Sequence, residues 1–136
     1  MRLALLVLSL LVASALSACG GNVCKKGDAN CSCALAGTCA WSCSGGECAF
    51  VNSGAGDATF DCPDGKCTLG NSGQGAATLN CAAGNCTVTN SAQGSVTVNC
   101  AGGGCSVACS GQGTCNITGC PTCGCTASIT ATCNVK

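Results

Sequence analysis

The chain has 136 residues and a formal net charge of zero, and it contains 19 cysteines and 21 glycines. Only 7% of its residues are charged, so it lacks the basic surface that follows nucleic-acid phosphates, and we expect no nucleic-acid partner. It has no histidine and no tyrosine, and no possible nucleophile has a base near it in sequence. These features predict a protein that is not an enzyme and needs no cofactor.

Residues 1–18 have the pattern of a cleaved export signal. Arg2 is followed by 14 residues, 3–16, that are apolar, small or serine. Such a run is too short to span a bilayer comfortably, which favours a signal peptide over a transmembrane helix. A buried core helix is the alternative, but the cysteine-rich remainder offers no partner for a helix this apolar.

The signal ends in Leu16-Ser17-Ala18-Cys19, which resembles the lipobox of bacterial lipoprotein precursors. The resemblance implies that Cys19 receives a diacylglyceryl thioether, becomes the mature N-terminus and carries fatty-acyl chains such as palmitate. It also implies attachment to a membrane of the bacterial cell envelope. Gly20 stands where a retention signal would place aspartate, so the resemblance favours the outer membrane or the cell surface over the inner membrane.

Cysteine parity agrees with lipidation. If Cys19 is lipidated, 18 cysteines remain and can all pair. An ordinary signal cleaved near Ala15 or Ala18 is the alternative, and it leaves an odd thiol. We predict that residues 19–23 are the lipidated N-terminus and a short tether, in which Gly20 to Val23 span at most ~14 Å.

Large apolar side chains are scarce after residue 19. Each contributes ~1.5–3 kcal/mol when fully buried, whereas ordering the backbone costs ~1–2 kcal/mol per residue. The cysteines of an exported chain supply the missing stability as a disulfide framework, at ~2–4 kcal/mol for each bridge. We therefore predict a domain that is folded when oxidised and collapses when reduced.

A 19-residue repeat runs four times through residues 43–119. Each copy holds two cysteines, two apolar positions and a glycine-rich turn at constant spacing, which marks a repeat architecture. Bridges within each cysteine pair are the simplest arrangement, and bridges between neighbouring coils are the alternative. The pairs are Cys43 and Cys48, Cys62 and Cys67, Cys81 and Cys86, and Cys100 and Cys105.

Each copy also predicts two short strands. Positions 48, 50 and 52 alternate with their neighbours, as do 58, 60 and 62, so that one face of each strand is buried. We predict an all-β, disulfide-rich β-solenoid of about four to five coils, with an asparagine column able to hydrogen-bond along the stack. An antiparallel β-meander uses the same strands, but the stacking of equivalent coils explains the identity of the columns better.

The sequence on either side of the repeats loses the period. Cys109 replaces the asparagine of the last copy and Cys115 follows across the turn, which predicts an additional bridge across a terminal coil. We predict irregular, cysteine-rich caps at 24–42 and 120–136, because the open ends of a stack need protection from edge pairing.

Metal binding is an alternative use of the cysteines outside the repeats. Cys31-Ser-Cys33 and Cys120-Pro-Thr-Cys123-Gly-Cys125 have ligand-like spacing. The lack of histidine and the oxidising compartment favour disulfides, so we predict no metal site and no redox Cys-x-x-Cys. Calcium binding at Asp57 and Asp61 is not expected either, because the repeat equivalents of Asp57 are not acidic.

One outward column is a candidate binding surface. If the solenoid forms, Thr59, Thr78 and Thr97 make a flat ridge, flanked by Asp61, Asn80 and Asn99. This arrangement resembles that of insect antifreeze proteins, which implies binding to ice or to another ordered surface such as a glycan. Threonine is also a common strand residue on a solvated face, and that alternative stays open.

These observations lead us to expect a lipid-anchored, disulfide-stabilised repeat protein of the cell envelope with a structural or interaction role. Its expected partners are the membrane, through the N-terminal lipid, and an unidentified protein or glycan. The alternative function is a module that binds ice or glycan through the threonine ridge.

Overall fold

A computed structural model describes residues 22–136, and the predicted signal peptide and lipobox, including Cys19, lie outside this range. The described residues form strands and turns. The strands are β1 (Asn22–Lys25), β2 (Cys31–Cys33), β3 (Cys39–Ser44), β4 (Ala49–Asn52), β5 (Ala58–Asp61), β6 (Thr68–Asn71), β7 (Ala77–Asn80), β8 (Thr87–Asn90), β9 (Val96–Asn99), β10 (Ser106–Cys109), β11 (Thr114–Thr118), β12 (Gly124–Ala127) and β13 (Thr132–Val135).

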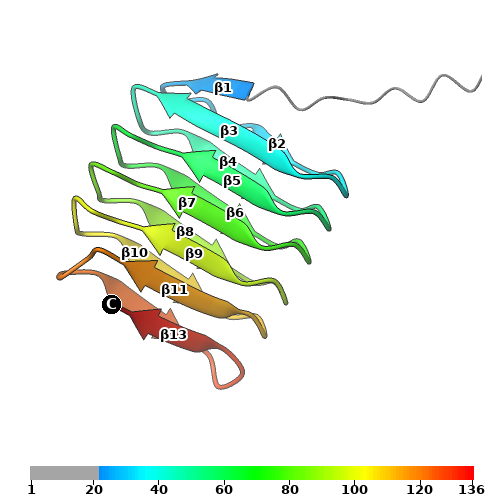
Figure 1. Ribbon diagram of the computed structural model, residues 1–136, viewed down its shortest axis with the longest axis vertical. Helices are drawn as coiled ribbons and strands as arrows, with labels where there is room; N and C mark the ends of the chain where they lie inside the picture. Colours follow the sequence, from blue (N-terminus) through cyan, green and yellow to red (C-terminus); the bar gives the residue numbers. More distant parts are fainter. Residues whose placement is uncertain (1–21) are drawn as a thin grey trace, which may run out of the picture.

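Successive strands alternate between two parallel sheets, so the chain winds as a β-solenoid (Figure 1). The odd-numbered strands form a seven-stranded sheet and the even-numbered strands a six-stranded sheet. Within the repeats, register partners lie 19 residues apart, as Phe60 with Leu79 and Leu79 with Val98. The predicted solenoid is therefore confirmed, and the antiparallel meander is not formed.

The stack has about six coils, more than the four to five predicted. The difference comes from the two ends. The segment 24–42 supplies strands that pair with β4 and β5 in the 19-residue register. The segment 120–136 forms β12 and β13, which pair with β10 and β11 at an offset of 18 residues. Segments that we expected as irregular caps thus continue the coil.

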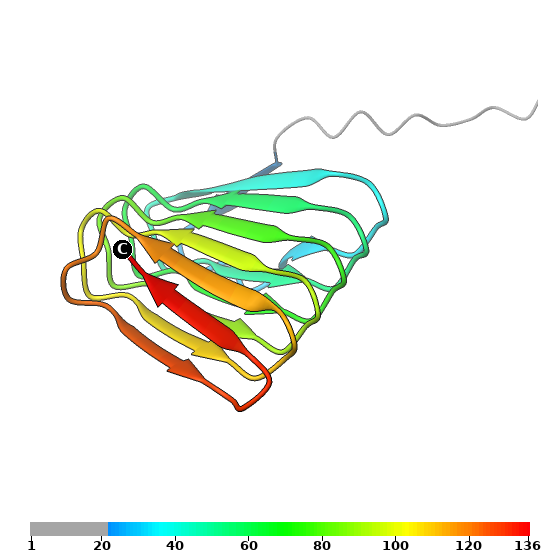
Figure 2. The same ribbon diagram turned by 60° about the horizontal axis from the view of Figure 1, so that its bottom comes forward.

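The core lies between the two sheets as a single file of side-chain pairs, and Figure 2 shows the two layers of strands. Phe50 on β4 contacts Phe60 on β5, with ring centroids 4.8 Å apart. Leu69 and Leu79 occupy the same columns in the next coil, and both are fully buried. One large pair per coil is a thin core, as the composition predicts.

A row of buried asparagines runs beside this file. The side-chain amide of Asn52 donates to Oδ1 of Asn71 at 2.8 Å, and that of Asn71 donates to Oδ1 of Asn90 at 2.9 Å. Asn90 ends the row by donating to the backbone oxygen of Gly94 at 3.0 Å. Each of the three buried amide nitrogens thus has an acceptor, which offsets the cost of removing it from water, whereas Oδ1 of Asn52, at the start of the row, has no donor among the described residues.

Nine disulfides pair all 18 cysteines of the described residues, and every bridge closes a short loop within the stack. The four repeats carry the pairs expected from their spacing. Cys109 pairs with Cys115, but it does so in the fifth coil rather than in a terminal one. The remaining pairs are Cys24–Cys31, Cys33–Cys39, Cys120–Cys123 and Cys125–Cys133.

Close stacking explains the glycine columns. A methyl group added to Gly75 would overlap the backbone oxygen of Gly56 in the preceding coil, and one added to Gly94 would overlap that of Gly75. On the opposite edge, Gly65 turns the chain with φ 73°, in the left-handed region that favours glycine. Both turns therefore need residues without a side chain.

Candidate functional site

The predicted threonine ridge lies on the outer face of the seven-stranded sheet. Thr59, Thr78 and Thr97 are direct register partners on β5, β7 and β9. Their strand neighbours are buried, so the threonines point away from the core. With parallel strands ~4.8 Å apart, the three threonines follow one another at a regular interval along the stack.

A second polar row runs beside the threonines and is hydrogen-bonded along its length. The amide of Asn80 donates to Oδ1 of Asp61, and that of Asn99 donates to Oδ1 of Asn80, both at 2.6 Å. Thr118 closes the row by donating its hydroxyl to Oδ1 of Asn99 at 2.6 Å. We call this row the outer amide ladder. It holds Asn80 and Asn99 in fixed orientations, and the sequence reasoning missed Thr118 as its last member.

The outer face of the six-stranded sheet is a flat surface that sequence reasoning also missed. Thr68, Thr87 and Ser106 are register partners there, and Thr89 lies beside Thr87 on the same face. The outward positions of the even-numbered strands from β4 to β12 carry no charge. The alternation Thr87-Val88-Thr89 was the sequence signal for this face.

The five carboxylates of the described residues are exposed and serve the scaffold. Asp57 accepts a hydrogen bond from the backbone nitrogen of Ala76 in the next coil at 2.9 Å, which is a structural use of the residue that had suggested calcium. Asp28 and Asp64 likewise accept from backbone nitrogens, Asp61 belongs to the outer amide ladder, and Glu47 lies 3.6 Å from Lys26. Among the described residues, the side-chain groups close enough together to hold a metal ion consist of cysteines and include none of these carboxylates.

The motifs with ligand-like cysteine spacing are divided among disulfides. Stacking brings sulfur atoms of neighbouring bridges within 4.8 Å of one another, as for Cys81, Cys100 and Cys105. Each of these sulfurs is already bonded to another sulfur, so the groups are stacked disulfides rather than sets of thiolates. The motif residues themselves pair as Cys24–Cys31, Cys33–Cys39, Cys120–Cys123 and Cys125–Cys133.

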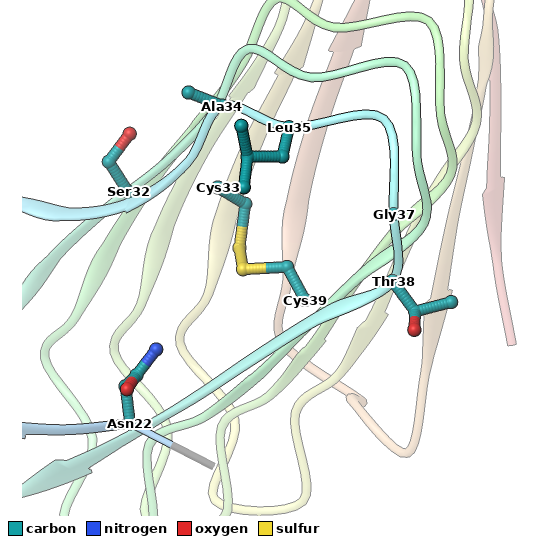
Figure 3. Close-up of a pocket in the computed structure, with 8 residues that line it drawn as sticks. All are labelled: Asn22, Ser32, Cys33, Ala34, Leu35, Gly37, Thr38 and Cys39. Atoms are coloured by element: carbon teal, nitrogen blue, oxygen red, sulfur yellow. A yellow bond between two sulfur atoms is a disulfide. The ribbon is translucent and has the colours of Figure 1, made fainter. Parts of the chain in front are cut away.

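A pocket of about 280 Å³ opens at the end of the stack formed by β1, β2 and the turn 34–38. Figure 3 shows the Cys33–Cys39 disulfide between Leu35 on one side and Asn22 on the other. Leu35 is 71% exposed. The pocket is the open end of the core, because β2 has a partner strand on one side only within the described residues.

No helix in the range 22–136 is long and apolar enough to cross a membrane. Comparisons of the chain with protein-family models, with curated proteins and with solved structures found no match.

Proposed function

We propose that the chain is an exported, non-enzymatic scaffold protein of a bacterial cell envelope, anchored in a membrane through a lipid on Cys19. The observation that carries the proposal is the cysteine pairing. All 18 cysteines of residues 22–136 pair with one another, so none of them remains as a partner for Cys19, the lipobox cysteine.

The distribution of polar groups supports a scaffold rather than an enzyme. The carboxylates accept backbone hydrogen bonds, join the outer amide ladder or pair with a lysine. The buried asparagines bond mainly to one another and to the backbone. These groups are committed to holding the coils together, which leaves two flat sheet faces as the surfaces offered to partners.

The anchor places these faces close to the membrane. Residues 19–21 span at most ~11 Å when extended, and the seven strands of the longer sheet span ~29 Å along the stack. The domain is therefore short along the stack axis, and the outer faces of its two sheets are its main lateral surfaces. We infer that it acts through contact with a protein or glycan in the outer membrane or at the cell surface.

Intact mass of the protein from its native membrane tests the anchor. We expect a chain that begins at Cys19 and carries acyl chains, with 18 cysteines alkylated only after reduction. Cys19→Ser should lose the acyl mass, whereas Ser17→Ala, which keeps the acceptor sulfur, should retain it. Export of an acyl-free wild-type chain would contradict the proposal.

A second candidate function is binding to an ordered surface, ice or a glycan, through the threonine ridge. It is supported by the direct register of Thr59, Thr78 and Thr97 and by the outer amide ladder that fixes the adjacent column. Thr78→Lys should abolish this binding. Thr87→Lys, at a threonine on the opposite face, is the matched control and should leave it intact.

A further inference from the structure

Leu35 projects from the N-terminal end of the stack. It holds the column position of Gly54, Gly73 and Gly111, and at each of these glycines an added methyl group would overlap a backbone oxygen of the preceding coil. Side chains in this column therefore point along the stack toward the N-terminal end. No strand precedes β2 in its sheet within the described residues, so the side chain of Leu35 points off the end and is 71% exposed.

The same end is open and apolar. β1 extends the seven-stranded sheet beyond β2, and the pocket of about 280 Å³ lies where a further strand of the six-stranded sheet would stand. Its lining includes Leu35, Ala34 and the Cys33–Cys39 disulfide (Figure 3). On the outer face of β1, Val23 is 66% exposed.

Charged groups lie at the C-terminal end of β1, whereas the pocket lies beside the first residue of that strand, Asn22. Lys25 and Lys26 follow the buried Cys24 and are exposed, and two acidic residues, Asp28 and Glu47, are exposed near them. Glu47 lies 3.6 Å from Lys26. The end thus combines exposed aliphatic side chains with amino groups, a pattern that suits the interface between lipid tails and headgroups.

We propose that this N-terminal end is a docking surface for the phospholipid bilayer that holds the anchor. The inference rests on the proposed lipidation of Cys19. Only two residues, Gly20 and Gly21, separate the acylated cysteine from Asn22, which lines the pocket. A tether of at most ~11 Å keeps this end at the membrane surface, where even a weak contact is formed because its effective concentration is high.

The contact is at headgroup depth. The backbone groups on the free edge of β2 require hydrogen-bond partners, which the hydrocarbon interior does not supply. Leu35 and Val23 reach the acyl boundary, while Lys25 and Lys26 lie among the phosphates. In this orientation the first coil contacts the membrane, and the outer faces of both sheets do not.

The chain offers a matched pair of reporter sites. Ile129, in the last coil, is aliphatic and even more exposed than Leu35, but it belongs to the opposite end of the stack. Leu35→Trp and Ile129→Trp are compared with the unchanged protein, so that Trp41 contributes equally to all three. The acylated proteins are reconstituted in vesicles of phosphatidylcholine and phosphatidylglycerol with or without brominated acyl chains, which quench tryptophan at close range.

Brominated lipid should remove most of the emission that Leu35→Trp adds and little of the emission that Ile129→Trp adds. If the proteins are acylated and neither position is quenched, or both are quenched equally, the docking surface is wrong although the anchor stands. If mass spectrometry finds no acyl chain, the anchor is wrong and the unlipidated proteins are tested with the same vesicles. Selective quenching of Leu35→Trp then still supports a membrane-binding end, and its absence overturns it.

Discussion

The side-chain amide of Asn71 donates a 2.9 Å hydrogen bond to Oδ1 of Asn90, one coil further along the stack. Asn71 also accepts the amide of Asn52 at 2.8 Å. A single buried side chain thus connects three successive coils. Its removal leaves the amide of Asn52 without an acceptor and leaves Oδ1 of Asn90 with only the backbone nitrogen of Ala92, at 3.3 Å.

We predict that Asn71→Ala lowers the free energy of unfolding by about 1–3 kcal/mol for each buried group left unpaired. The matched control is Asn80→Ala in the outer amide ladder, where water replaces the lost partner and the expected loss is about 1 kcal/mol or less. Chemical denaturation with the disulfides intact measures both. Equal losses would show that the buried row does not depend on its hydrogen bonds.

Because neighbouring coils are in close contact at Gly75, we expect a side chain added at this position to lower the free energy of unfolding. Gly75→Ala places a methyl group against the backbone oxygen of Gly56, and the forced separation should cost about 1–3 kcal/mol. Gly70→Ala is the control, because the same methyl group meets nothing within 4 Å. Its expected effect is neutral or slightly stabilising. Thermal unfolding of the two variants distinguishes them, and a stable Gly75→Ala protein would contradict the stacking distance.

The turn between the two cysteines of each repeat stores backbone strain in some copies. Lys66 has φ 59° and Asn85 has φ 58°, in the left-handed region, whereas the equivalent position of the fourth repeat is glycine, Gly104. Lys66→Gly should raise the free energy of unfolding by about 0.5–1 kcal/mol, because relief of strain exceeds the entropy cost of glycine.

Asn85→Gly is the control for this turn, and it should gain less because asparagine tolerates the left-handed conformation. Denaturant midpoints of the two variants provide the comparison. A larger gain at Asn85 than at Lys66 would rule out this explanation.

We predict that the chain does not fold without its disulfides. The Cys81–Cys86 bridge closes a loop with a sequence separation of 5, and the paired substitution of both residues by alanine should cost about 2 kcal/mol in loop entropy, plus the loss of buried sulfur. Reduction of all nine bridges should abolish the β-sheet circular dichroism. Retention of that signal after complete reduction and alkylation would mean that the core is sufficient without them.

The sequence predicted the repeating part of the fold in detail, but it underestimated the ends. Within 43–119, identical residues recur because each coil has a neighbour on both sides, and each column must fit both. A terminal coil has one neighbour, so its side chains vary while its backbone hydrogen bonds remain. Loss of the pattern at 24–42 and 120–136 therefore suggested caps, although β2, β3, β12 and β13 continue the stack.

By itself, the sequence determined the 19-residue coil, the inward and outward faces of the strands and the short disulfides of the repeats, because these depend on local spacing. The tertiary structure decided between the parallel solenoid and the antiparallel meander, and it alone decided that Cys33 pairs with Cys39 at the start of the buried asparagine row and that Leu35 points off the stack. These features depend on which coils are neighbours. Neighbouring coils pair through backbone hydrogen bonds, and these bonds do not depend on residue type, so the sequence does not specify them.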